Sequence, residues 1–137
     1  MGQIHEPKPV QLFCGAIYTA AVPLGRIRAA LESVFGAADF VSGEIPFDFT
    51  DYYEKEMGAG LTKWIAAFEK LVPPENIVEA KLETNRLEEE FAREFGTPDA
   101  PRPVNLDPGF VDAARLSLAT TKDFFHRIYV GRGIYAE

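Results

Sequence analysis

The chain has 137 residues, which is the size of a single domain. Hydrophobic residues make up 47% of it and charged residues 26%, a composition that excludes an intrinsically disordered protein. Its 14 basic and 21 acidic residues give a net charge of -7, which argues against nucleic acid as a partner because phosphate binding requires clustered Lys and Arg.

The only cysteine, Cys14, lies in an apolar run, which favours a buried, unreactive thiol and excludes an internal disulfide or a cysteine-rich metal cluster. The longest uncharged stretch covers 9–25, but Gln11 interrupts it and it is too short to span a bilayer comfortably. Glu6 and Lys8 before it make a poor export signal. We therefore expect a cytoplasmic protein without a membrane partner.

The first part of the chain alternates between strand-like and helix-like patterns. Residues 1–9 are polar and predict a flexible tail, and the apolar run over 10–19 predicts a central strand. The segment 23–36 predicts a helix, because proline stands in its first turn and glycine just past its end. Alternation over 40–49 predicts a half-buried strand, and Pro46 favours a position at the sheet edge or a bulge.

The next segment holds a short helix and an ambiguous element. Residues 51–57 predict a short helix that Gly58 closes. The residues of 61–72 fit both a helical spacing and the alternation of a strand, and periodicity alone slightly favours the helix. Both interpretations stay open on the residues alone.

The rest of the chain predicts one long helix and several strands. The helix begins after the Pro73-Pro74 break and ends at Phe95. A proline-rich loop follows. The predicted strands are 104–106, which Asp107-Pro108-Gly109 ends, then 116–120, and 126–136 with a tight turn or a bulge at Gly131-Arg132-Gly133.

Three groups of motifs are distinctive. They are Pro46 to Gly58, Val104 to Gly109, and Ala119 to Asp123 together with His126 to Tyr129 and Gly133 to Glu137. Together with the Leu12-Phe13-Cys14-Gly15 and Lys81-Leu82-Glu83-Thr84-Asn85 segments, they resemble a family of uncharacterised bacterial proteins, domain of unknown function 4416, over nearly the whole chain. The resemblance implies no known activity.

The resemblance bears on the ambiguous segment and on the C-terminus. Members of this family carry more β-like residues where 61–72 lies, which implies a strand there. They also continue past the position of Glu137, so either this chain is truncated at residue 137 or this member of the family is short.

We therefore expect a single domain over 1–137 of the α+β class. With a strand over 61–72, the order of elements predicts a ferredoxin-like β-α-β-β-α-β core with extra C-terminal strands. Its mostly antiparallel sheet would be covered by two helices. With a helix there, the chain would still mix helices and strands.

No complete cofactor or catalytic motif is present. Residues 58–63 resemble a phosphate-binding loop but lack its Gly-Lys pair, and 131–133 is half of a dinucleotide fingerprint. There is no nucleophile elbow and no His-Glu-x-x-His zinc motif. The cofactor therefore stays unknown.

One polar cluster near the C-terminus combines two hydroxyls, an ammonium, a carboxylate, an imidazole and a guanidinium. Its members are Thr120, Thr121, Lys122, Asp123, His126 and Arg127. Such groups bind anions, and His126 is a candidate general acid or base, with Asp123 and Lys122 as further catalytic candidates. An ordinary charged hairpin is the alternative, and it is the simpler interpretation.

A second cluster is acidic. Asp48, Asp51, Asn105 and Asp107 offer the oxygen ligands that Mg²⁺ prefers, although helix caps and turns explain them more simply and we assign no metal. The Tyr52-Tyr53 pair could line a pocket and offer hydroxyls. The predicted ligand-binding set is Asp48, Asp51, Tyr52, Asn105, Asp107, Thr120, Thr121 and Arg127.

The sequence therefore predicts a protein that binds or acts on a small anionic metabolite or a nucleotide, and it leaves open whether the protein is an enzyme. The alternative is a non-catalytic interaction or assembly module, for instance one that forms a homo-oligomer through a sheet edge.

Overall fold

The computed structural model describes all 137 residues and has the α+β architecture, with three helices and eight strands. The strands are β1 (Val10–Tyr18), β2 (Ala38–Val41), β3 (Ile45–Phe47), β4 (Leu61–Val72), β5 (Val104–Val111), β6 (Leu116–Thr120), β7 (Ile128–Gly131) and β8 (Ile134–Ala136). The helices are α1 (Leu24–Phe35), α2 (Glu54–Met57) and α3 (Asn76–Phe95).

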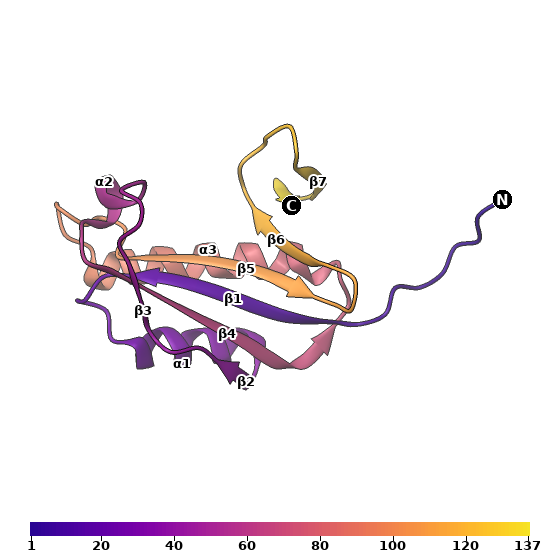
Figure 1. The fold of residues 1–137 in the computed structure, drawn as a ribbon, viewed down its shortest axis with the longest axis horizontal. Helices are drawn as coiled ribbons and strands as arrows, with labels where there is room; N and C mark the ends of the chain where they lie inside the picture. The colour runs from indigo at the N-terminus through magenta and orange to yellow at the C-terminus, as the bar shows by residue number, and fades with distance from the viewer.

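The strands form one sheet in the order β2-β4-β1-β5-β6-β8-β7, with β3 also pairing with β4. Each of these pairings is antiparallel. Figure 1 shows the long strands β1, β4 and β5 running side by side, with the C-terminal strands beyond β6 and the N-terminal residues extending away from the sheet.

One face of the sheet packs against α1 and α3. Side chains of β1 alternate between the two faces, and Leu12, Cys14 and Ala16 are buried on the helix side. They share one core of 21 buried residues with apolar side chains of both helices, among them Ile27 and Ile77. Two of the helices thus cover this face, as the sequence predicts. Burial also raises the pKa of the Cys14 thiol, as expected for an unreactive cysteine.

The other face carries a smaller cluster under α2. Ile17, Phe47, Met57 and Leu61 form it, and the ring of Tyr53 packs against them. The helices α1 and α3 lie on the opposite side, so they do not cover this face. The rest of this face is open and is bordered by α2 and the C-terminal strands.

The ambiguous segment 61–72 is a strand. It pairs with β1 along most of its length and with both β2 and β3 on its other side. Pairing on both sides satisfies the backbone hydrogen-bonding groups of this segment. The segment is therefore a strand, although the spacing of its apolar residues also fits a helix.

The prediction of a single strand over 40–49 is wrong, because two short strands, β2 and β3, lie there. Between them, the side chain of Ser42 replaces a ladder contact: its Oγ accepts a hydrogen bond from the Ile65 N–H at 2.9 Å, while the Ser42 N–H donates to the Ile65 carbonyl at 2.8 Å. Pro46 lies in β3, which pairs only with β4, and so occupies an edge position as predicted.

The prediction that a turn at 107–109 ends the strand after Leu106 is also wrong, because β5 continues to Val111. Leu106 directs its N–H away from β1, and Pro108, two residues further, directs its nitrogen to the same side. Pairing with β6 begins only at Gly109, so the missing N–H of Pro108 costs no ladder hydrogen bond.

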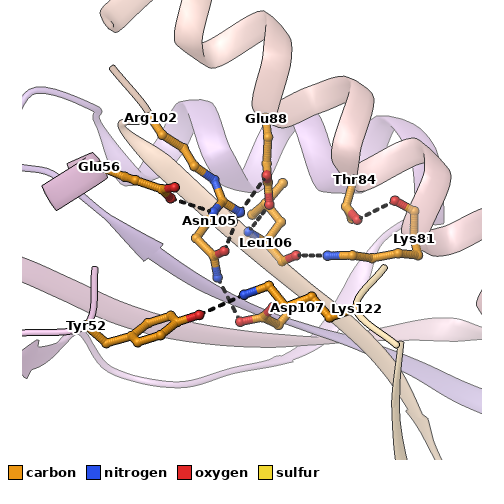
Figure 2. Close-up of polar contacts among 10 residues, drawn as sticks. All are labelled: Tyr52, Glu56, Lys81, Thr84, Glu88, Arg102, Asn105, Leu106, Asp107 and Lys122. Carbon is orange, nitrogen blue, oxygen red and sulfur yellow. Dashed lines mark hydrogen bonds and ion pairs between the residues drawn. The ribbon is translucent and has the colours of Figure 1, made fainter. Parts of the chain in front are cut away.

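The part of β5 that β6 leaves uncovered is closed by two charged side chains of α3. The Lys81 ammonium donates a hydrogen bond to the Leu106 carbonyl at 3.0 Å, and a Glu88 carboxylate oxygen accepts one from the Leu106 N–H at 2.6 Å. Figure 2 shows both side chains reaching the same residue of the strand. The helix therefore satisfies backbone groups that a neighbouring strand would otherwise take.

The remaining predicted elements are present with small shifts of their ends. The segment 126–136 is a hairpin of β7 and β8 whose turn includes Gly131 and Gly133, both with positive φ. None of the helices combines the length and the apolar character required to cross a membrane.

Candidate functional site

A pocket of about 480 Å³ lies on the face of the sheet opposite α1 and α3. The strands β1, β4, β5 and β6 form its floor, and the α2 segment and the C-terminal strands form its walls. Its lining residues are Phe13, Gly15, Ile17, Tyr52, Tyr53, Lys63, Ile65, Asp107, Leu116, Leu118, Ala119, Thr120, Lys122, Arg127 and Glu137.

The strand register orders this floor from polar to apolar. At the α2 end, Lys63 stands opposite Ile17. In the middle, Gly15 stands between Ile65 and Asp107. At the far end are Phe13 and the two leucines of β6, because Phe13 is opposite Gly109 and Gly109 is opposite Leu118.

Two ammonium groups in the pocket have no carboxylate partner. Neither Lys63 nor Lys122 belongs to any of the ion pairs in the structure. Lys122 donates a hydrogen bond to the Tyr52 hydroxyl at 2.8 Å, and Lys63 lies 5.8 Å from the centre of the Phe47 ring. Such free cations attract an anion from solution.

The Asp107 carboxylate is held in place by a chain of side chains. Arg102 donates to the Glu88 carboxylate at 2.9 Å and to the Asn105 side-chain oxygen at 2.6 Å. This contact fixes the orientation of the Asn105 amide, whose nitrogen then donates to Asp107 at 2.8 Å. Figure 2 shows this chain running from Glu56 through Arg102 to the pocket floor.

The aromatic wall of the pocket is partly desolvated. Tyr53 packs inward while Tyr52 is exposed, and their rings meet edge to face at 4.9 Å. Burial raises the pKa of the Tyr53 hydroxyl, and the negative charge of Asp107 adds to the increase. Tyr53 is therefore a neutral hydrogen-bonding group at physiological pH.

An ion pair closes the opposite wall. The Arg127 guanidinium donates to Glu137 at 2.8 Å and to the Lys122 carbonyl at 3.0 Å, and the His126 ring nitrogen lies 2.7 Å from the same Glu137 oxygen. The hydrogen bond from Arg127 is the largest cause that holds the pKa of Glu137 below its usual range.

We expect Arg127→Gln to raise the pKa of Glu137 toward the ordinary glutamate value, measured by a carbon-13 NMR titration of its side chain. In the native protein a depressed carboxyl pKa adds stability above the unfolded-state value of about 4.3, and this stability is lost as the pH falls through the folded value. Arg132→Gln, which removes an exposed pair with Glu79, is the control. An unchanged Glu137 pKa in Arg127→Gln would contradict this account.

A family model described as "Domain of unknown function (DUF4416)" matches residues 8–137. The chain belongs to this family. No curated protein matches the DUF4416 chain, and no solved structure matches it.

The DUF4416 fold brings five of the predicted site residues together in the pocket. They are Tyr52, Asp107, Thr120, Lys122 and Arg127. Asn105 is 4% exposed and lies behind Asp107, on the same face of β5.

The other predicted residues do not line this pocket. Asp51 borders an adjacent polar depression of about 570 Å³, which shares Tyr52 and Lys122 with the pocket. Asp48, Thr121, Asp123 and His126 are exposed outside it. The alternative reading of Asp107 as a turn residue is wrong, because it lies within β5. No three His, Cys, Asp or Glu side chains gather in a group that could hold a metal ion.

Sequence reasoning missed three charged contributors to the DUF4416 site: Lys63, Arg102 and Glu137. A lysine within the apolar run Leu61–Ile65 was a usable signal, since a charged side chain there must face a pocket or solvent. The only sequence signal at Arg102 was its position between two prolines, and Glu137 carried no signal.

Proposed function

We propose that this protein binds a small anionic metabolite or nucleotide on the open face of its sheet. The observation that carries the proposal is the pair of ammonium groups, Lys63 and Lys122, that share one pocket without a carboxylate partner. They come from β4 and from the loop after β6, segments far apart in the sequence.

Further groups support binding of an oxyanion. The Thr120 hydroxyl and the neutral Tyr53 hydroxyl can donate hydrogen bonds to it. Asp107 can accept one from a ligand hydroxyl or amine, because its only hydrogen bond here is from Asn105. The pocket volume of about 480 Å³ is in the range of small-molecule sites.

The test is a thermal-shift and calorimetric panel of inorganic phosphate, a nucleoside monophosphate and short carboxylates, each with and without Mg²⁺. We expect at least one of these anions to bind, and Lys63→Met or Lys122→Met to weaken it about tenfold or more, as for the loss of a charged hydrogen bond. Lys70→Met is the matched control, because Lys70 is exposed at the other end of the same strand and has no ion pair. Failure of every anion in the panel would refute the proposal.

A non-catalytic assembly module is the second candidate, and a different observation favours it. Phe125, just before the edge strand β7, is 90% exposed, and Ile128, the first residue of β7, is 72% exposed. Antiparallel pairing of two β7 edges from two copies of the chain would bury them. Light scattering tests this: a dimer that Ile128→Lys converts to a monomer supports the assembly, and a monomer at millimolar concentration refutes it.

We also infer that the core is ferredoxin-like. The segment order β1-α1-β2-β4-α3-β5 supports this inference, with β3 as an addition at one edge and β6 to β8 as an extension at the other. A right-handed crossover through α1 and α3 is the expected handedness, and an experimental structure of the domain tests it.

A further inference from the structure

Gly15 lies in the middle of the pocket floor, where nothing in the fold requires a glycine. Its φ is not in the positive range, so its backbone conformation is open to any residue. A Cβ added there would meet no atom closer than the Asp107 carbonyl, at 3.9 Å, so packing does not exclude a side chain either. A glycine in a strand interior lowers stability, and such positions often mark close approach of a ligand.

Gly109 on the neighbouring strand shows the contrast. A Cβ there would lie 2.2 Å from the Ser117 carbonyl oxygen and 2.7 Å from the Phe13 ring. Packing therefore requires that glycine, whereas at Gly15 the missing side chain only leaves room on the pocket floor.

The room above Gly15 joins two chemically different ends of the pocket. On the α2 side lie the free ammonium groups of Lys63 and Lys122. On the other side the floor is apolar, formed by Phe13, Leu118 and Leu116. The charged groups beside this apolar end, Arg127 and Glu137, already neutralise each other.

We propose that the ligand is an amphipathic anion whose carboxylate or phosphate contacts Lys63 and Lys122 and whose apolar body crosses Gly15 to lie on Phe13 and Leu118. This inference rests on the proposed function, and it adds the class of ligand. An anion without an apolar part would leave the hydrophobic half of the floor in water, and an apolar molecule without a charge would leave the two ammonium groups unpaired.

The experiment titrates the full chain with acetate, butanoate, hexanoate and octanoate, followed by the NMR signal of the Gly15 amide and by calorimetry. Each added methylene that reaches the apolar floor is expected to tighten binding about fourfold. Hexylamine, which has the same number of carbon atoms but a positive charge, is expected to bind at least tenfold more weakly than hexanoate. Lys122→Met is expected to weaken all four carboxylates by a similar factor.

Two variants of Gly15 test the floor itself. Gly15→Val is expected to abolish the gain with chain length while acetate still binds, because its side chain occupies the path between the two ends. Gly15→Ala, for which the structure has room, is expected to reduce the gain in affinity with chain length by a smaller amount. This variant keeps the test valid if the valine variant does not fold.

The outcomes separate this inference from the proposed function. Equal affinity for acetate and octanoate overturns the amphipathic ligand and leaves anion binding standing, as does an unchanged chain-length gain in folded Gly15→Val. Equal affinity for hexylamine and hexanoate overturns the anionic part. Failure of all the carboxylates and of the anion panel overturns both proposals.

Discussion

The variant Gly109→Ala is expected to unfold about 10 °C below the native protein. The added methyl group would overlap the Ser117 carbonyl oxygen at 2.2 Å and the Phe13 ring at 2.7 Å, and the Ser117 carbonyl cannot move far because this residue belongs to the β5–β6 ladder. Overpacking of this kind costs about 3 kcal/mol, and about 3 °C is lost for each kcal/mol in a domain of this size. Differential scanning calorimetry measures the change.

The matched control for this variant is Gly25→Ala. Gly25 lies in α1, and a Cβ added there meets nothing within 4 Å. The free energy of unfolding of Gly25→Ala should stay within about 1 kcal/mol of the native value and should rise slightly, because alanine has the higher helix propensity. Equal losses in both variants would show that the close contact at Gly109 is not the cause.

The second large effect is expected for Glu88→Ala, with a loss of about 3 kcal/mol in the free energy of unfolding by urea. The Glu88 side chain is 11% exposed, and its removal leaves the Leu106 N–H and the half-buried Arg102 guanidinium without their main acceptor. Unpaired buried groups carry the full cost of desolvation.

Two further variants separate the contributions of Glu88. Glu89→Ala removes an exposed carboxylate one residue away and should change stability by less than about 0.5 kcal/mol. Glu88→Gln keeps an oxygen for the Leu106 N–H but cannot neutralise Arg102, so an intermediate loss is expected. A loss in Glu88→Ala no larger than in Glu89→Ala would refute the role assigned to this contact.

The elements that the sequence predicts well are those whose pattern and boundary residues agree. The helix α1 follows directly after Pro23 and ends before Gly36, and α3 follows the Pro73-Pro74 break. Periodicity failed to decide 61–72, because the spacing of Trp64 and Phe68 fits both structures and only the strands on either side distinguish them.

The end of β5 could not be predicted, because Pro108 and Gly109 usually stop a strand. In this fold both are accommodated: pairing with β6 begins only after Pro108, and the Phe13 ring of β1 covers Gly109. The contact with Phe13 joins segments far apart in the sequence, so it leaves no local signal.

The candidate site was predictable only where its residues are close together in the sequence. Lys122, Arg127 and Thr120 stand in one dense polar segment, and the sequence identifies them together. Lys63 joins them only because β4 is a strand whose open face carries this side chain, and that face could not be assigned while the segment remained ambiguous.

The closure of β5 by Lys81 and Glu88 also bears on how the protein behaves at high concentration. A length of strand without a neighbour is a template onto which another chain can add, and this is a common route to aggregation. Here the Leu106 N–H and carbonyl are already occupied, and an incoming strand would have to displace two charged side chains to reach them. The helix thus protects a gap in the sheet against edge-to-edge association.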